Sequence, residues 1–307
     1  TTAGSAAQTL IDAGVVGIAG AACSGATLGA IEIAKAAGTP MVSYASTSPA
    51  VTDHNDNGYL FRVVPSDAQQ GQAMAAVAAA ESFSNVALIY MTNDYGAGLA
   101  DAFEGSWSEA LCVKVGYDQD ATDFTSTIQQ VADSGCGSVV SVTYATDGAA
   151  IVEELAAQGG GDAPFLGADG IADLGFVNEF SDASAVAGIM ATKPSPGSDS
   201  AEKAAFEAAY TAAGGNASLL GIYTSEVYDA INIIAAAAMA DSDGDLRDDI
   251  AAVGINYAGA SGVHTFTATG DVVGSGYLVC TFVHDGTDAT LICDRTWNLV
   301  DGLQAAA

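Results

Sequence analysis

The chain has 307 residues, half of them hydrophobic, and carries 37 Asp and Glu against 7 Lys and Arg, a formal charge of −30. The hydrophobic content excludes a disordered acidic tail, and so acidic a surface excludes nucleic acid as a partner and disfavours docking on anionic lipid. A chain of this length is expected to form two lobes rather than one, with a solvated acidic coat suited to a salty environment.

Strands and helices are predicted to alternate from residue 5 to residue 169. The predicted strands are 15–20, 39–44, 59–66, 85–91, 112–118, 138–144 and 164–169. The predicted helices are 5–14, 26–38, 67–81, 96–110, 123–135 and 148–159. Helices around 199–214 and 223–240 follow, and then β-rich hairpins over 263–300. Because the strands are almost continuously apolar, we expect an α/β fold with parallel sheets covered by helices on both faces.

Four of the five cysteines are predicted to form two disulfides. Cys112 and Cys136 each lie near the beginning of a predicted strand, and Cys280 and Cys293 flank a predicted hairpin. Two such pairs indicate an oxidising compartment and leave Cys23 unpaired. No apolar run in the sequence is long enough to span a bilayer.

Motifs for metal, nucleotide or nucleophilic chemistry are not found. None of the three histidines belongs to an HExxH or a spaced Cys/His set, and no GxSxG, Walker A or GxGxxG sequence occurs. A Ser-His-Asp site stays open, although nothing favours it. The acidic loop 240–249 has Leu246 where an EF-hand needs Gly. We therefore predict no metal site and no cofactor, and calcium binding by this loop stays an open alternative. Asp245 is expected to cap the next helix.

Polar or aromatic residues follow five of the predicted strands, where ligands bind in open α/β sheets. They include Ser24, the hydroxyl-rich stretch 43–48, the NDYGAG stretch 93–98, Tyr144 and Asp169. Hydroxyls and helix N-termini suit a carboxylate, an isolated acid suits an ammonium group, and tyrosines suit an apolar side chain. Each such loop alone is more often structural, and Asp169 in GADG is also a common type of turn residue.

Seven segments of the sequence together carry a family resemblance. In chain order they are CSGATLGAIEIAKAAGTPMVSYASTSPAVTD, GYLFRVVPSDAQQGQAMA, NDYGAGLADAF, TDFTSTIQQV, FLGADGI, YTSEVYDAI and GVHTFTATGDVVGSGY. In this order, they resemble the type I periplasmic solute-binding proteins of ABC importers, in particular the leucine/isoleucine/valine (branched-chain amino acid) binding group. The resemblance covers essentially the whole chain.

The resemblance implies two Rossmann-like lobes with parallel central sheets, joined by a hinge of three crossovers. The crossovers fall near 65–67, 193–195 and 267–271. Lobe 1 would comprise 1–66 plus 195–268, and lobe 2 would comprise 67–194 plus 269–307. A typical member begins with a strand, a helix and a second strand that have no counterpart here, so we expect lobe 1 to be incomplete at its N-terminus. Cys23 resembles a family cysteine whose partner lies in that segment.

The resemblance also implies roles for seven residues. Ser24 and the turn formed by Ala45, Ser46 and Thr47 would bind the carboxylate of the ligand. Asp169 would pair with its α-ammonium group, facing the hydroxyls of the turn across the cleft between the lobes. Tyr95 and Tyr144 would close on the ligand from the second lobe. Tyr223 and Tyr228 are weaker candidates, because tyrosines on a helix more often pack in a core than contact a ligand.

The function implied is that of an extracytoplasmic solute-binding component of an ABC transporter, which captures a small, aliphatic or branched-chain amino acid by hinge closure. Such a protein is a periplasmic or extracellular monomer, with a lipid anchor in the precursor left open. It is recognised by a membrane permease and is not an enzyme. Alternatives are a ligand-binding sensor ectodomain and a binder of another small carboxylate or amide, with an enzyme a more distant possibility.

Overall fold

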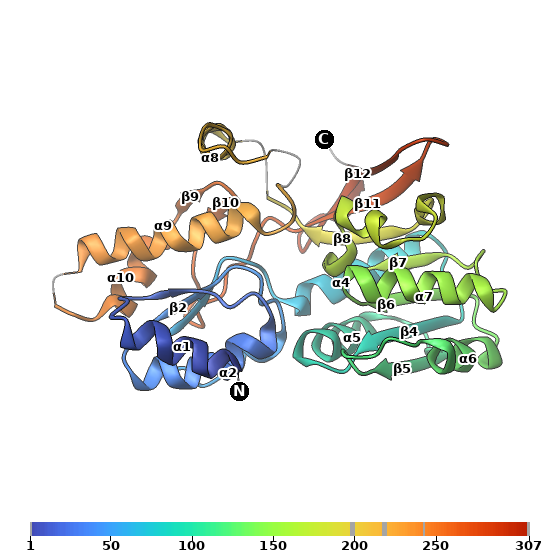
Figure 1. Cartoon of the computed structure of the whole chain (residues 1–307), viewed down its shortest axis with the longest axis horizontal. Coiled ribbons are helices and arrows are strands. Elements are labelled where there is room, and N and C mark those ends of the chain that lie inside the picture. The colour runs from blue at the N-terminus through green and yellow to red at the C-terminus, as the bar shows by residue number, and fades with distance from the viewer. Residues whose placement is uncertain (1, 197–199, 217–219, 242, 306–307) are drawn as a thin grey trace. The chain divides into compact units, whose positions relative to one another are not determined.

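The computed structural model of the protein describes residues 2–196, 200–216, 220–241 and 243–305, and the chain divides into two compact units (Figure 1). Unit 1 comprises Thr1–Ser66 and Pro196–Ser275, and unit 2 comprises Asp67–Ser195 and Gly276–Ala307. The chain therefore passes between the units three times.

The third passage lies later in the chain than the sequence suggests, because residues 269–275 stay in unit 1. Phe266 and Val272 form an isolated antiparallel bridge, which folds the segment back on itself. At its tip, the carbonyl of Gly270 accepts a hydrogen bond from the backbone N–H of Arg62 over 2.9 Å. These contacts hold the turn against the sheet of unit 1.

Unit 1 contains a parallel sheet of three strands with helices on both faces. In spatial order the strands are β1 (Ile18–Ala19), β2 (Met41–Ser43) and β3 (Leu60–Arg62). The main helices are α1 (Thr2–Asp12), α2 (Ser24–Ala36), α9 (Thr224–Ala240) and α10 (Leu246–Val253). Because side chains alternate along a strand, Met41 and Leu60 pack in one cluster with α1 and α2, whereas Val42 and Phe61 pack in another with α9 and α10.

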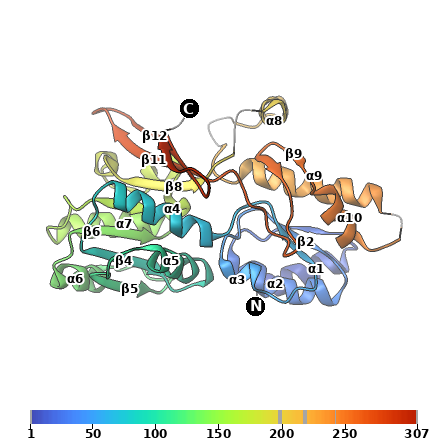
Figure 2. The same cartoon turned by 180° about the vertical axis from the view of Figure 1, so that it is seen from behind.

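Smaller elements complete unit 1. They are α3 (Pro49–Thr52), α8 (Ala201–Ala212) and the antiparallel pair β9 (Tyr257–Gly259) and β10 (Gly262–His264). Helix α8 matches the helix predicted around 199–214, whereas α3 was not predicted. Figure 2 shows α3 beside α2. Asp245 precedes α10 as expected, but its side chain does not cap the helix and instead accepts hydrogen bonds from Arg247.

Unit 2 is built on a sheet of eight strands in the order β13-β12-β11-β8-β7-β6-β4-β5. The parallel strands are β4 (Val86–Met91), β5 (Val113–Tyr117), β6 (Ser138–Val142), β7 (Phe165–Gly167) and β8 (Met190–Pro194). The antiparallel ones are β11 (Tyr277–His284), β12 (Ala289–Asn298) and β13 (Gly302–Ala305). The prediction of parallel sheets followed by a β-rich ending is thus confirmed, although β8 was missed.

Helices cover both faces of this sheet (Figures 1 and 2). The long helices are α4 (Asp67–Ala80), α5 (Asp94–Ser106), α6 (Thr125–Ser134) and α7 (Ala145–Ala157). Helix α4 packs against α5, and α6 packs against α7. Short 3-10 helices follow β7: η1 (Asp169–Ile171), η2 (Leu174–Glu179) and η3 (Ala183–Val186).

The largest core cluster lies in unit 2 and includes the fully buried Leu88 and Ile89 of β4. Both tryptophans of the chain are in this unit. Trp107 stacks on Phe103 with ring centroids 5.9 Å apart, and Trp297 packs against Tyr277 at 6.2 Å. The two indoles are 9% and 6% exposed, so each is fixed in its surroundings.

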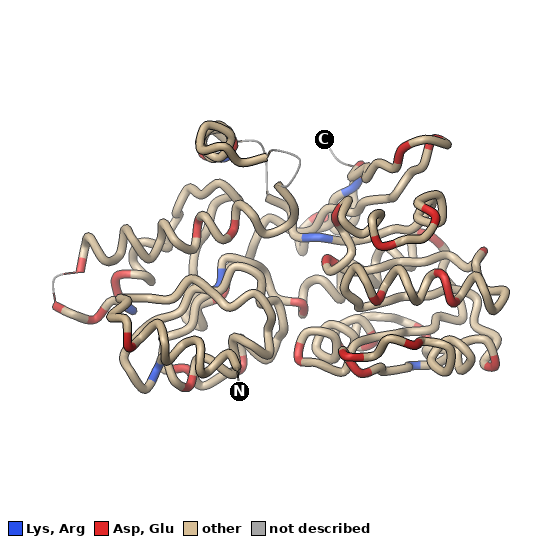
Figure 3. Tube along the Cα trace, in the orientation of Figure 1, with Lys and Arg blue, Asp and Glu red and all other residues tan. Residues whose placement is uncertain are grey.

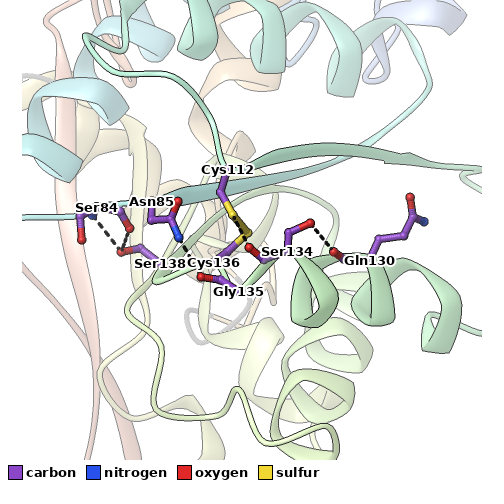
Figure 4. Close-up of a disulfide and its surroundings, with 8 residues drawn as sticks. All are labelled: Ser84, Asn85, Cys112, Gln130, Ser134, Gly135, Cys136 and Ser138. Carbon is purple, nitrogen blue, oxygen red and sulfur yellow. Dashed lines mark hydrogen bonds between the residues drawn. A yellow bond between two sulfur atoms is a disulfide. The ribbon is translucent and has the colours of Figure 1, made fainter.

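The two predicted disulfides are confirmed, and both lie in unit 2. Cys112–Cys136 joins the segments just before β5 and β6, with Cα atoms 5.7 Å apart (Figure 4). Beside it, the Asn85 side chain donates to the carbonyl of Gly135 over 2.7 Å. Cys280–Cys293 is a cross-strand pair between β11 and β12, with Cα atoms 3.9 Å apart. Cys23 is free, as predicted, and its side chain is exposed.

Acidic residues are spread over the helices and loops of both units, and the few Lys and Arg residues are scattered among them (Figure 3). Within the described residues, no helix combines the length and apolar character needed to cross a membrane.

Candidate functional site

In unit 1, a buried turn follows β2, and Ser43, Ser46, Thr47 and Ser48 are all fully buried there. The hydroxyl of Ser43 donates to the carbonyl of Ala21 over 2.7 Å and accepts from the N–H of Ser46 over 3.0 Å. The hydroxyl of Ser46 lies 2.8 Å from that of Thr27 and within 3.1 Å of two carbonyls of the loop after β1. The Ser46 hydroxyl thus helps to hold the turn against this loop.

The predicted carboxylate-binding residues of unit 1 are brought together by the same turn. Ser24 is the first residue of α2, is buried, and accepts a hydrogen bond from the N–H of Ser48 over 3.2 Å. The hydroxyl of Thr47 is buried and has no hydrogen-bond partner among the described residues. Ala45 is half-buried and offers only backbone groups. The N-terminus of α2, with its partial positive charge, therefore adjoins a turn in which one hydroxyl is unused.

In unit 2, three predicted residues form one cluster at the carboxyl ends of the strands. Asp169 begins η1 just after β7 and is 4% exposed. The hydroxyl of Tyr95, from the first turn of α5, donates to Oδ1 of Asp169 over 2.7 Å. The ring of Tyr144 stacks on that of Tyr95, with centroids 5.5 Å apart and planes 5° from parallel. Burial and then the negative charges of Asp169 and Asp67 hold the pKa of Tyr95 well above its usual value, so this phenol stays a donor.

Three residues near this cluster were missed from the sequence. Asp67, the first residue of α4, is fully buried, and its charge acts on Tyr95. Tyr117, at the end of β5, donates to Asp147 in the first turn of α7 over 3.1 Å. Burial raises the pKa of both Tyr117 and Asp147. An acid in the first turn of a helix that follows a strand is the signal that could have indicated Asp67 and Asp147. The negative charges of Asp67, Asp147 and Asp169 favour a cationic ligand group.

The two weaker tyrosine candidates differ in their settings. Tyr228, on α9, packs against Phe206 of α8 with ring centroids 4.9 Å apart, as expected of a packing residue. Tyr223 immediately precedes α9 and has a φ of 68°, in the left-handed region that is unusual for a bulky residue. Because such strain concentrates at functional sites, Tyr223 is the stronger of the two candidates.

A buried Ser-His-Asp group does exist in unit 1, but its geometry is not that of a catalytic triad. Nε2 of His264 lies 3.0 Å from the Ser261 hydroxyl and 3.1 Å from Oδ2 of Asp229, so a single ring nitrogen faces both partners. A triad needs one nitrogen for each. Asp229 also accepts hydrogen bonds from the N–H groups of Ala260 and Ser261, over 2.8 Å each. The group ties α9 to the β9–β10 hairpin.

The acidic loop before α10 places carboxylate oxygens of Asp241, Asp243 and Asp249 within 4.8 Å of one another. Two of these side chains already serve the loop itself. Asp241 accepts from the N–H groups of Asp243 and Gly244, and Asp243 accepts from that of Asp245. Aspartates commonly bond to backbone N–H groups in turns in this way, and we assign no metal to the loop.

Comparison with known sequences places the chain in a family of ligand-binding regions. The sequence model described as the receptor family ligand binding region matches residues 1–285. Metabotropic glutamate receptor 4 of Macaca fascicularis is 30% identical over 126 residues, which are 39% of this chain but only 14% of the receptor. The chain thus matches a small part of that much longer protein.

Solved structures of solute-binding proteins are similar over nearly the whole chain. The leucine binding protein LivK of Thermotoga maritima superimposes with a TM-score of 0.83 at 24% identity, covering 97% of this chain and 85% of that one. LivJ of Streptococcus pneumoniae, a branched-chain amino acid transporter substrate binding protein in complex with isoleucine, gives 0.79 at 24% identity, covering 94% and 83%. A solute binding protein of an R. palustris ABC transporter, in complex with 4-hydroxybenzoate, gives 0.84 at 19% identity, covering 96% and 82%. With its α/β units and their parallel sheets, the chain has the type I periplasmic binding protein fold and belongs to the receptor ligand-binding region family.

Proposed function

We propose that this chain is the extracytoplasmic solute-binding component of an ABC transporter and captures a small aliphatic amino acid. One observation carries the proposal: the two units offer complementary groups. Unit 1 has the unused Thr47 hydroxyl beside the N-terminus of α2, and unit 2 has the buried carboxylate of Asp169 held by Tyr95. A single zwitterion has one group for each.

The carboxylate end of the ligand requires positive potential, and the sequence has only seven Lys and Arg residues. Hydroxyl and N–H donors at a helix N-terminus are the alternative means of satisfying a buried carboxylate. Ser24 fixes the turn against that helix, which leaves Thr47 as the donor that a ligand would engage.

The ammonium end requires an acid, because a charge removed from water is costly unless it is paired. Asp169 supplies one, and Asp67 adds further negative charge to the same neighbourhood. Tyr144 is 37% exposed and stacks on Tyr95, so its outer face can cover an aliphatic side chain. The isoleucine complex of the Streptococcus protein supports this ligand class.

A small carboxylate without an ammonium group is the second candidate, since the R. palustris relative was solved with 4-hydroxybenzoate. Such a ligand could use Thr47 and stack on Tyr144, but it would bring no ammonium group to the carboxylate of Asp169. The amino acid is therefore the better fit. The match to metabotropic glutamate receptor 4 supports a third possibility, in which the same fold acts as a sensor ectodomain.

The proposed setting of the protein is outside the cytoplasm, next to a membrane transporter. Two disulfides support an extracytoplasmic location, periplasmic or extracellular. The partner would be the membrane permease of the transporter, and the protein would act as a monomer that binds its ligand without chemical conversion.

A thermal-shift screen tests the proposal. The probes are the amino acids, leucinamide, isoamylamine, 4-hydroxybenzoate and benzoate. A ligand at 100 times its Kd stabilises the protein by about 2.7 kcal/mol, which is readily measured. We expect leucine, isoleucine or valine to raise Tm and isoamylamine, which lacks the carboxylate, to have no effect. A shift with the aromatic acids alone would overturn the amino-acid proposal.

A further inference from the structure

The largest fully buried side chain in the described residues is that of Arg62, on β3. Its guanidinium group makes four hydrogen bonds within unit 1. Nε donates to Asp271 over 2.5 Å, and Nη2 donates to the Thr52 hydroxyl over 2.6 Å. Nη1 donates to two backbone carbonyls, those of Ser46 at 3.1 Å and Ser48 at 3.0 Å. The single nitrogen Nη1 therefore binds the backbone on both sides of Thr47, and we call this pair of hydrogen bonds the grip.

This grip fixes the direction of the Thr47 N–H. In a trans peptide the C=O and the following N–H lie in one plane and point in opposite directions. The carbonyl of Ser46 points at Arg62, so the N–H of Thr47, in the same peptide, points away from the guanidinium group. The second carbonyl, that of Ser48, is followed by Pro49, which has no N–H of its own. The bond to Ser48 therefore holds the turn without diverting another donor.

We propose that Arg62 is a positioning residue for ligand recognition, which aims the backbone N–H and hydroxyl of Thr47 at the carboxylate of the bound amino acid. This inference rests on the proposed function. Arg62 itself is fully buried and acts on the turn through the carbonyls of Ser46 and Ser48. Polarisation of the Ser46 peptide by the cation also strengthens the Thr47 N–H as a donor.

The same side chain connects the turn to the segment that leads to the third passage between the units. Asp271 accepts from Arg62 and also from the Thr269 hydroxyl over 2.8 Å, and the Arg62 N–H bonds to the carbonyl of Gly270. The position of the carboxylate-binding turn is thereby tied to residues more than 200 positions later in the chain.

Only an arginine can make this set of contacts. Its planar group presents five donors in a fixed fork, whereas a lysine has one nitrogen at the end of a flexible stem. The partners of Arg62 are reached through three different nitrogens. Arg62→Lys keeps the charge but cannot reach the carbonyls of Ser46 and Ser48 together with Asp271 and Thr52. It therefore separates the geometry of the grip from its charge.

The test compares leucine with leucinamide, whose neutral amide replaces the carboxylate, by titration calorimetry on the whole chain. In the wild type, leucine should bind more tightly than leucinamide. In Arg62→Lys, leucine should lose at least about tenfold in affinity and leucinamide less than about threefold, so that the preference for the carboxylate collapses. Arg247→Lys, which alters an arginine paired with Asp245 in the same unit, is the matched control and should keep the wild-type preference.

Each outcome has one meaning. If the wild-type protein binds no amino acid, the proposed function fails, and the role of Arg62 fails with it. If the wild type binds leucine and Arg62→Lys keeps the preference, or loses both ligands equally, only the positioning role is overturned. Should Arg62→Lys fail to fold, Thr52→Val decides, because it removes one bond that orients the guanidinium group. A preference lowered about threefold then supports the role, and an unchanged preference overturns it.

Discussion

The hydroxyl of Tyr95 donates to the carboxylate of Asp169 over 2.7 Å, and the N–H of Gly170 in turn donates to that hydroxyl over 3.3 Å. Tyr95 and Asp169 are both at least 95% buried. The acid proposed to receive the ammonium group is therefore oriented by its own unit rather than by the ligand. Preorganisation of this kind reduces the entropy lost on binding.

Replacement of Asp169 by Ala should abolish amino-acid binding while the fold stays intact. The loss should be about 3–5 kcal/mol, because the ligand ammonium would be buried without its partner. Calorimetric titration with leucine measures the loss, and circular dichroism checks the fold. Near-native affinity in the variant would remove the basis of the amino-acid assignment.

Replacement of Tyr95 by Phe keeps the stacked ring but removes the donor to Asp169. We expect leucine affinity to fall by about 1.5–3 kcal/mol, the usual value of a hydrogen bond to a charged group. The matched variant Tyr144→Phe keeps the ring that stacks on Tyr95 and leaves the Asp169 contact untouched, so its affinity should change less. Equal losses in the two variants would argue against a role for the Tyr95 hydroxyl.

Removal of either disulfide should destabilise unit 2. The cysteines of the pairs are 24 and 13 positions apart, and loop-closure entropy for such spacings corresponds to roughly 3–3.5 kcal/mol for each bond. Urea unfolding of Cys112→Ala/Cys136→Ala and of Cys280→Ala/Cys293→Ala measures the effect. Cys23→Ala is the control and should leave the midpoint unchanged, since that thiol is free and exposed.

The free energy of unfolding should decrease at acidic pH, because Asp229 becomes protonated there. Burial by itself would raise the pKa of this carboxyl, but the hydrogen bonds from His264, Ser261 and Ala260 hold it below its usual value. A lowered folded pKa contributes stability above the unfolded pKa, near 3.9, and that contribution is lost as pH falls through the folded value.

The variant Asp229→Asn tests this pH dependence. It should be less stable than the wild type at pH 6, and the difference should narrow at pH 3, as measured by urea midpoints. Asp12→Asn, at an exposed carboxylate, is the control and should keep the wild-type pH dependence. A constant difference between the Asp229 variant and the wild type at both pH values would contradict the assignment.

Salt should stabilise the protein, because its formal net charge of −30 causes repulsion between carboxylates in the compact state. The Debye length falls from about 30 Å at 0.01 M to about 3 Å at 1 M, so Tm should rise steadily across that range. Screening depends on ionic strength and not on the cation, so NaCl, KCl and choline chloride should give the same curve. A Tm that is independent of salt would count against the repulsion.

The alternation of helices and strands was predictable because apolar runs and glycines mark the parallel strands and helix ends directly. Strand β8 was missed because Met190–Pro194 carries a lysine and a proline, and its place in the sheet is set by β7 and β11 on either side. Helix α10 was expected only as a helix of unstated length after Asp245, because the aspartates around it suggested a loop. These elements depend on neighbours that are distant in sequence.

The candidate site was predictable only in part. The loops after the strands and the family resemblance indicated Ser24, Thr47 and Asp169, because their chemistry is visible in the sequence. The sequence does not reveal that the Ser46 hydroxyl bonds within its own unit, because its partners, the carbonyls of Ala21 and Ala22, belong to another loop. The role of Arg62 was equally hidden, because its nearest partner in sequence is ten positions away.

Both indoles of the chain, Trp107 and Trp297, lie in unit 2, whereas unit 1 contains none. Intrinsic tryptophan emission is therefore an optical label on one half of the molecule. Excitation at a wavelength selective for indole follows the unfolding of unit 2 alone, while far-ultraviolet circular dichroism follows both units. A difference between the two melting curves would give the separate stability of unit 1 without any introduced dye.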